Sequence, residues 1–219
     1  MADTVEITFA GERLWLDPAR ALWWPAQDML IVSDLHLGKG AFLRRHGSAL
    51  PALDTHDTLL RLGQLIEQYR PQHLVCLGDS FHDRAAYQAM AAADRTQLSH
   101  LMARVLQWHW VLGNHDPVIE RDLPGAFHNT LNIESLLLTH EPVQSAMPQI
   151  IGHFHPKHMM RLGGRSVSGP CFMISQALII MPAFGSYTGG LDCADPMITS
   201  LMPGGAESHF IYNGKLWKA

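Results

Sequence analysis

The chain has 219 residues, of which 47% are hydrophobic and 16% are charged, and its formal net charge is −4. This composition excludes a largely disordered chain, and the negative charge excludes a basic field over the whole surface that would attract nucleic acid. We expect a single domain over residues 1–219, because this length is enough for one well-buried core.

The N-terminal half contains clear strand and helix patterns. Apolar and polar residues alternate in Val5–Phe9 and Arg13–Leu16, which predicts a hairpin, and Ala21–Trp24 favours a further strand. Leu53–Tyr69 has helical periodicity. Ala85–Val105 is rich in alanine and predicts a second helix.

Five short apolar runs end abruptly in polar residues of the kinds that bind metals. A wholly apolar run fits a strand buried on both faces, and helices between the first three runs fit crossover connections. Ligands bind beyond the carboxyl ends of such strands, so we expect the five polar tips to converge. Each tip alone could be an ordinary turn, but five in one chain favour a site. The runs with their tips are Met29–Val32 with Ser33-Asp34-Leu35-His36, Leu74–Leu77 with Gly78-Asp79, Trp108–Leu112 with Gly113-Asn114-His115-Asp116, Leu136–Leu138 with Thr139-His140-Glu141, and Ile150-Ile151 with Gly152-His153-Phe154-His155.

The C-terminal part favours loops and one hairpin. Lys157 and His158 follow the last polar tip and could contact substrate, but a position in an exposed loop is favoured. The segment from Pro182 to Gly190 is rich in glycine and proline and is also expected to be a loop. Ser208–Tyr212 and Lys215–Trp217 flank an Asn-Gly pair, which predicts a closing hairpin.

The cysteines and the N-terminus indicate a cytoplasmic protein. Three widely spaced cysteines without a CxxC pair predict reduced thiols. The first ten residues contain Asp3 and Glu6 and no basic region, so no signal peptide is expected there. No apolar stretch approaches ~18 residues, so we expect no membrane span and no membrane partner.

The spacing of the polar residues indicates how they could share a cavity. Asp34 and His36 are two positions apart, as are His153 and His155, and on an extended strand end this spacing directs both side chains to one side. Carboxylate and imidazole groups without thiolate suit manganese, iron or zinc.

The number of candidate ligands predicts two ions. Seven ligands exceed what one ion needs, and two ions could share Asp79, because Gly78 beside it lets the backbone come close. Two divalent ions, two aspartates and a bridging hydroxide leave about one positive charge, which suits a phosphate anion. His115 would be placed to act at the leaving oxygen.

These motifs together resemble the calcineurin-like metallophosphoesterase superfamily. The resemblance implies an α/β fold, a four-layer α/β/β/α sandwich with two packed mixed sheets. It also implies two divalent metal ions, with manganese favoured and iron or zinc also suitable. His115 would be a catalytic histidine that is not a ligand. One ion would be held by Asp34, His36, Asp79 and His155, and the other by Asp79, Asn114, His140 and His153.

A narrower resemblance connects the chain with DNA. The stretch from Asp34 to Lys39, followed by Phe42, Arg44-Arg45 and Pro51, is similar to bacterial DNA-ligase-associated metallophosphoesterases, as is the stretch from Pro182 to Gly190. Members of that family are described as endonucleases linked with the DNA damage response. The resemblance implies DNA, and repair proteins associated with DNA ligase, as partners.

The block Gly78-Asp-Ser-Phe-His82 resembles a block of the SbcD-type recombination nucleases. This resemblance implicates His82 in phosphodiester cleavage, although Ser80 stands where those nucleases have leucine. Their large DNA-binding cap has no room in this chain. Asp83 and Asp116 could orient His82 and His115, or they could simply stabilise turns.

Three basic residues follow the first polar tip and are candidates for substrate binding. Lys39, Arg44 and Arg45 could clamp the substrate phosphate, since arginine favours bidentate contacts with phosphate. They could equally be charges that face solvent.

We therefore expect a metal-dependent phosphodiesterase or nuclease that acts on DNA in repair, through attack by a hydroxide that bridges two metal ions. The alternative is a phosphoesterase for small nucleotides or cyclic nucleotides, which the negative net charge and the missing cap favour. A lipid-precursor pyrophosphatase would need an apolar, basic, helical insert. A non-catalytic scaffold would have lost ligands, and none is lost here. The sequence does not indicate an oligomeric state.

Overall fold

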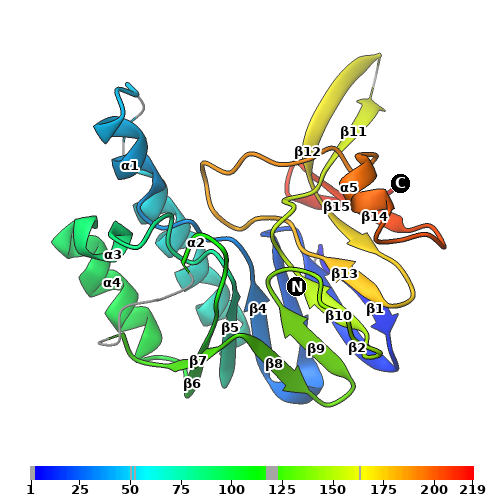
Figure 1. Cartoon of the computed structure of the whole chain (residues 1–219), viewed down its shortest axis with the longest axis horizontal. Coiled ribbons are helices and arrows are strands. Elements are labelled where there is room, and N and C mark those ends of the chain that lie inside the picture. Colours follow the sequence, from blue (N-terminus) through cyan, green and yellow to red (C-terminus); the bar gives the residue numbers. More distant parts are fainter. Residues whose placement is uncertain (1–2, 50, 52, 117–122, 163) are drawn as a thin grey trace.

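The computed structural model describes residues 3–49, 51, 53–116, 123–162 and 164–219. Two mixed β-sheets pack face to face, with most of the helices outside the first sheet (Figure 1). This arrangement confirms the expected α/β fold. Within the described residues, no helix has the length and apolarity needed to span a membrane.

The first sheet has the strand order β1-β2-β3-β4-β5-β6-β7. Neighbours from β1 to β4 are antiparallel, whereas β4 to β7 are parallel. The N-terminal hairpin and the first three apolar runs are therefore confirmed as strands. The bounds are β1 Val5–Phe9, β2 Glu12–Asp17, β3 Ala21–Trp24, β4 Met29–Val32, β5 His73–Leu77, β6 Gln107–Val111 and β7 Ala126–His128.

The second sheet has the order β15-β14-β12-β13-β10-β9-β8, with β11 paired to β12. The last two apolar runs form the parallel neighbours β9 and β10, and the C-terminal hairpin is confirmed. The loop expected at Lys157 and His158 is wrong, because both residues begin β11 and pair with β12. The bounds are β8 Thr130–Ile133, β9 Leu136–Thr139, β10 Gln149–Ile151, β11 Lys157–Leu162, β12 Arg165–Ile174, β13 Leu178–Ile180, β14 Glu207–Tyr212 and β15 Lys215–Lys218.

The helices are α1 Lys39–Arg45, α2 Asp54–Tyr69, α3 Ala86–Ala89, α4 Ala92–Met102 and α5 Pro196–Thr199, with the 3₁₀ turn η1 at Pro25–Gln27. The helix expected from residue 53 to 69 is confirmed. The single helix expected over Ala85–Val105 is wrong, because Met90 and Ala91 are extended with ψ of 148° and 144°. Arg95 stabilises this break by donating hydrogen bonds to the carbonyls of Gln88 and Met90.

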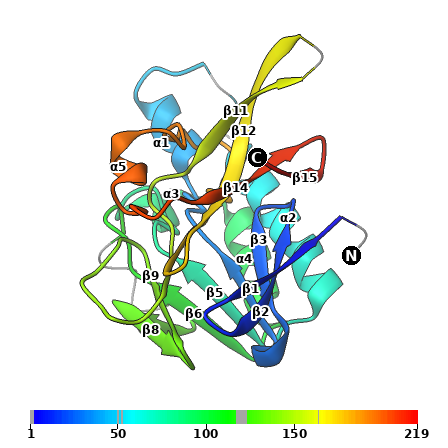
Figure 2. The ribbon, with the colours of Figure 1, turned by 90° about the vertical axis from the view of Figure 1, so that its right-hand side faces the viewer.

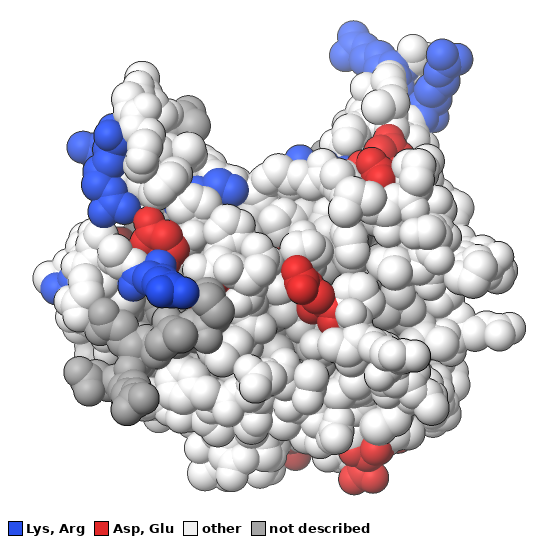
Figure 3. Space-filling view, in the orientation of Figure 1, with Lys and Arg blue, Asp and Glu red and all other residues white. Residues whose placement is uncertain are grey.

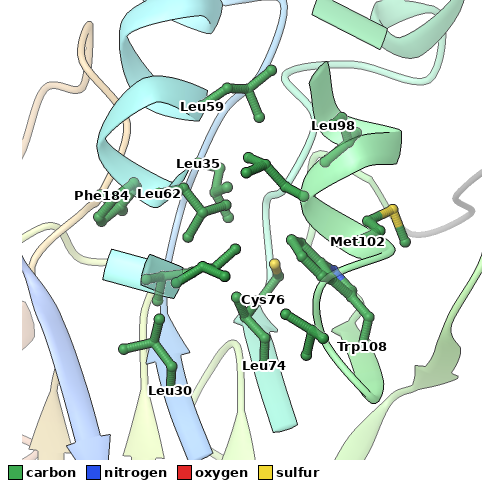
Figure 4. Close-up of a cluster of buried hydrophobic side chains, with 14 of the residues drawn as sticks. Leu30, Leu35, Leu59, Leu62, Leu74, Cys76, Leu98, Met102, Trp108 and Phe184 are labelled. Carbon is green, nitrogen blue, oxygen red and sulfur yellow. The ribbon is translucent and has the colours of Figure 1, made fainter. Parts of the chain in front are cut away.

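Three hydrophobic clusters separate four layers. The first lies between the helices α2 and α4 and the outer face of the first sheet, where Leu62 and Leu98 from the helices and Leu74 and Cys76 from β5 point into one cluster (Figure 4). The second fills the space between the sheets, and the third lies between the second sheet and α5. The short α5 is thus the fourth layer. Consecutive residues of β5 enter different clusters, Leu74 the first and Val75 the second, so this strand is buried on both faces as its composition predicted.

Two segments project from the same side of the molecule. One is α1 and the other is the hairpin of β11 and β12, and both stand clear of the sheets in two perpendicular views (Figures 1 and 2). The surface is hollowed between them, and lysine and arginine side chains gather on both projections (Figure 3). The carboxyl ends of β4, β5 and β6 point toward this side, which positions the site described next.

Candidate metal centre

The polar tips of the five apolar runs meet at one edge of the two sheets. Strands β4, β5 and β6 are parallel in the first sheet, and β9 and β10 are parallel in the second. The tips follow the carboxyl ends of these strands, and contacts across the two sheets connect them. The expected convergence is therefore observed, and it joins residues separated by more than 100 positions.

The backbone at these tips differs from the expectation. Asp34 and His36 were expected on an extended strand end, but their φ angles are 53° and 45°. Asp79, His153 and His155 are also left-handed, with φ of 44°, 70° and 46°. Left-handed backbone is unfavourable for residues with a Cβ and concentrates where surrounding structure holds it in place, often at functional sites. Sharp turns, rather than a pleated strand, direct these side chains into one cavity.

One group of contacts lies around Asp34. His155 Nε2 is 3.0 Å from Asp34 Oδ1 and 3.4 Å from His36 Nε2. The carboxylate of Asp34 also accepts hydrogen bonds from the backbone N–H of His153. Asp34 and His36 are buried, so their ligand atoms face each other away from solvent.

A second group of contacts lies around Asn114 and His140. Asn114 Oδ1 is 3.0 Å from both His140 Nε2 and His153 Nδ1. His140 Nε2 is also 3.4 Å from Asp79 Oδ2, and that oxygen lies 3.9 Å from His36 Nε2 in the first group. Asp79 therefore stands between the two groups.

Two glycines of the tips leave room for these side chains. A Cβ added at Gly78 would overlap the ring of His140, so the close approach expected at this glycine is made by an imidazole of the site. A Cβ added at Gly152 would lie 2.5 Å from Asp34 Oδ2. The site is built directly against the backbone of both glycines.

Burial and neighbouring charges determine the protonation of the site. Burial lowers the pKa of His36 to about 3, although Asp34 acts in the opposite direction. Burial also opposes protonation of His140, but its hydrogen bond with Asp79 and the charges of Asp34 and Asp79 raise its pKa to about 9. Burial would raise the pKa of Asp79, but His140 lowers it to about 2. Near pH 7, Asp79 is thus ionised and His36 neutral, the forms that bind cations, whereas His140 would release a proton on binding one.

The donor set fits two cations. Asp34, His36 and His155 place one ligand atom each within 4.8 Å of one another, and Asp34, Asp79 and His140 form a second such group. Ring nitrogens face each other across 3.4 Å in the His36–His155 pair. A cation between such atoms would engage the lone pairs of both. Nitrogen and carboxylate oxygen without thiolate are the ligands that manganese, iron and zinc accept.

Both candidate catalytic histidines lie beside the candidate metal ligands. The rings of His82 and His115 stack with centroids 5.3 Å apart, and the centroid of His115 is 5.3 Å from that of His36. His115 Nδ1 is 3.1 Å from the carbonyl oxygen of His82. Because a carbonyl only accepts hydrogen bonds, Nδ1 carries a proton, and Nε2 is the nitrogen left to gain or lose one.

The three basic candidates divide into two kinds. Lys39 begins α1 and is half-buried near Asp54 and Asp79, where burial lowers its pKa and the two carboxylates raise it. Arg44 and Arg45 are exposed near the end of α1, on one of the two projections. Arg45 Nη2 is 3.4 Å from Asp83 Oδ2, so this arginine is partly neutralised.

Two residues beside the candidate ligands, Ser33 and Asp116, support the site through hydrogen bonds. Ser33 Oγ contacts Asp34 Oδ2 and lies 3.0 Å from the carbonyl oxygen of Leu77. Asp116 accepts hydrogen bonds from the backbone N–H groups of Gly113 and Phe81 and so ties the loops after β6 and β5 together. The turn-stabilising alternative for Asp116 is what the structure contains. Only the position of Ser33 next to Asp34 could have pointed to its role.

Comparison with known proteins gives a consistent result. The family model described as calcineurin-like phosphoesterase matches residues 29–165. The crystal structure of the nuclease MPE from Pseudomonas putida is 28% identical, with a TM-score of 0.76, and the match covers 99% of this chain and 100% of that chain. The structure of Yfce, a phosphoesterase from E. coli, is 16% identical over 87% of this chain and 97% of that chain, with a TM-score of 0.39. No curated protein sequence matches the chain.

Proposed function

We propose, from the premise that this chain belongs to the calcineurin-like phosphoesterase family, that it is a nuclease that hydrolyses phosphodiester bonds in DNA with two divalent metal ions. The observation that carries the proposal is the convergence of seven ligand-type side chains from five strand ends of two sheets. Manganese is the proposed metal.

The contacts support a division of the ligands into two sets that share Asp79. Asp79 Oδ2 faces His36 of one group and His140 of the other, as a bridging carboxylate should. We assign Asp34, His36, Asp79 and His155 to one ion, and Asp79, Asn114, His140 and His153 to the other. Asn114 and His153 enter the second set through the shared contact at Asn114 Oδ1.

When bound, the two ions supply Lewis acidity and a hydrolytic nucleophile at neutral pH. The protein contributes His115, whose Nε2 would give a proton to the leaving oxygen while Nδ1 is held by the carbonyl of His82. His82 stacks on His115 and would restrict its orientation. Lys39 would add positive charge beside the phosphate.

The preference for a nucleic acid rests on the Pseudomonas putida protein, which is a nuclease and matches this chain over its full length. The choice of DNA rests on the resemblance of the sequence to the DNA-ligase-associated metallophosphoesterases. A second candidate function is hydrolysis of small nucleotides or cyclic nucleotides. The net charge of −4 favours it, because a net negative charge does not attract long polyanions.

Purified protein with Mn²⁺ would be tested on single-stranded DNA, duplex DNA, 2′,3′-cyclic nucleotides and bis(p-nitrophenyl) phosphate. We expect cleavage of DNA and of the small diester. Cleavage of the cyclic nucleotides alone would overturn the nuclease proposal. An active sample with less than one metal per chain would overturn the two-ion mechanism.

Variants separate catalysis from metal binding. His115→Ala should lower kcat about 10²- to 10⁴-fold at unchanged metal content, as removal of a general acid does. His82→Ala should have a smaller effect in the same direction. The matched control is His100→Ala, since His100 is an exposed histidine of α4.

A further inference from the structure

A polar groove begins at the metal centre and is not explained by the chemistry above. It is a cavity of about 390 Å³ bounded by the turn after β2, the start of β11, residues 168–170 in the middle of β12 and the loop after β13. His155, a proposed metal ligand, lies in its wall, so the groove opens beside the metal centre. The side chains that matter here are Arg20, His155, Lys157, Ser168, Ser186 and Thr188. We call this cavity the His155 groove.

The charge of the groove is opposite to that of the whole chain. Arg20 and Lys157 are basic residues, and none of the described residues that line the groove is a carboxylate. The chain as a whole carries a net charge of −4. Ser168 adds a hydroxyl donor without charge, whereas the hydroxyls of Ser186 and Thr188 already donate to Asp57 and to the carbonyl of Gly185. A lining of this kind suits an anion with several oxygen acceptors.

Arg20 is placed to bind such an anion. Its Nη1 makes only long contacts, 3.4 Å each, to the carbonyls of Ala183 and Gly185. Within the described part of the chain, no carboxylate oxygen lies within salt-bridge distance of Arg20. Asp57 is near, but it pairs with Arg61 at 3.1 Å and with Ser186 at 2.5 Å. A half-buried guanidinium without a close anionic partner binds phosphate oxygens favourably.

The groove extends a line of cations across the metal centre. Lys39, Arg44 and Arg45 lie on the α1 side, and the His155 groove lies on the side of the β11–β12 hairpin, whose tip carries the exposed Arg161. Lysine and arginine gather on both sides of the hollow in Figure 3. A nucleic-acid strand that crosses the metal centre from the side of α1 would place its next phosphates in the His155 groove.

We propose that the His155 groove binds a phosphate of the substrate strand next to the one being hydrolysed, which makes a polynucleotide the preferred substrate over a mononucleotide. This inference rests on the proposed function, because it takes hydrolysis at the metal centre as given. Arg20 and Lys157 are then substrate-binding residues that act on affinity rather than on the chemical step.

The test compares a single-stranded oligonucleotide with bis(p-nitrophenyl) phosphate, which has one phosphate and therefore no neighbouring phosphate to occupy the groove. Arg20→Met and Lys157→Met keep much of the apolar stem and remove the charge. Each should raise KM for the oligonucleotide about 10-fold or more and should reduce the salt dependence of binding by about one phosphate contact. For both variants, kcat/KM for the small diester should stay within about two-fold of wild type.

Arg104→Met is the matched control, because Arg104 is an exposed cation outside the groove. If Arg20→Met lowers the thermal unfolding midpoint, its KM would also reflect lost stability, and Lys157→Met then tests the groove proposal. An unchanged KM for the oligonucleotide in Lys157→Met, or an equal loss on both substrates, would overturn the groove proposal. A wild-type protein that cleaves neither substrate would instead refute the proposed function.

Discussion

His155 Nε2 lies 3.0 Å from Asp34 Oδ1, although the two residues follow strands of different sheets. The contact joins the carboxyl end of β4 to the loop after β10. A cation held by both residues would therefore link the two sheets.

Metal binding should consequently stabilise the fold. Because Mn²⁺ would bind the folded chain and not the unfolded one, a concentration 100 times its Kd should raise the free energy of unfolding by about 2.7 kcal/mol. Thermal unfolding followed by circular dichroism with Mn²⁺ or a chelator would measure this. His155→Ala should reduce the increase, and the exposed His56→Ala should retain it. An equal Mn²⁺ effect in wild type and His155→Ala would locate the stabilising ion elsewhere.

Ser33 should support the metal site through Asp34. Its Oγ contacts Asp34 Oδ2 and so orients the carboxylate. Removal of such a supporting hydrogen bond typically lowers metal affinity about 10- to 100-fold, so we expect a loss of this size in Ser33→Ala, measured by Mn²⁺ titration calorimetry. Ser80→Ala is a sharp control, since Ser80 is buried beside Asp79 and its Oγ has no hydrogen-bond partner among the described residues. Similar affinities in the two variants would contradict the role of Ser33.

Gly152 should not tolerate a side chain. A Cβ there would lie 2.5 Å from Asp34 Oδ2 and would overlap Ser33 Oγ, so Asp34 would have to move. We expect Gly152→Ala to lose Mn²⁺ binding and about 1–3 kcal/mol of unfolding free energy, as overpacked sites do. Gly204 has open space around its Cα, and Gly204→Ala should match wild type in both measurements. Full metal binding by Gly152→Ala would show that the site can shift without loss.

His109 should make the fold sensitive to acid. It lies between His73 and His128, and burial and these two imidazoles lower its pKa to about 4 from an ordinary value of 6.5. Between these values the unfolded chain takes up a proton on His109 more readily than the folded chain does. The free energy of unfolding should therefore fall as the pH decreases from about 6.5 to about 4. In urea titrations, His109→Gln should show a shallower fall than wild type, whereas the exposed His100→Gln should not. Parallel curves for wild type and His109→Gln would contradict this.

The sequence alone located the candidate ligands and the strands that carry them. Runs such as Leu74–Leu77 are apolar throughout because β5 is buried on both faces, and this leaves a strong local signal. The polar tips that follow these runs meet because parallel strands end at the same edge of a sheet. Local composition therefore sufficed to identify Asp79 and His140 as members of one site.

Only the tertiary structure decided how the side chains reach that site. The left-handed backbone of Asp34 and His36 depends on packing against the tips of other strands, as at Gly152, and not on local propensity.

The His155 groove is also a feature that the sequence alone does not predict. Arg20 and Lys157 lie far apart in the sequence, and the residues around them do not indicate that they line one cavity. Their shared cavity exists because the packing of the two sheets brings the turn after β2 beside the start of β11. A contact of this range depends on the packing of whole layers, which no short stretch of sequence encodes.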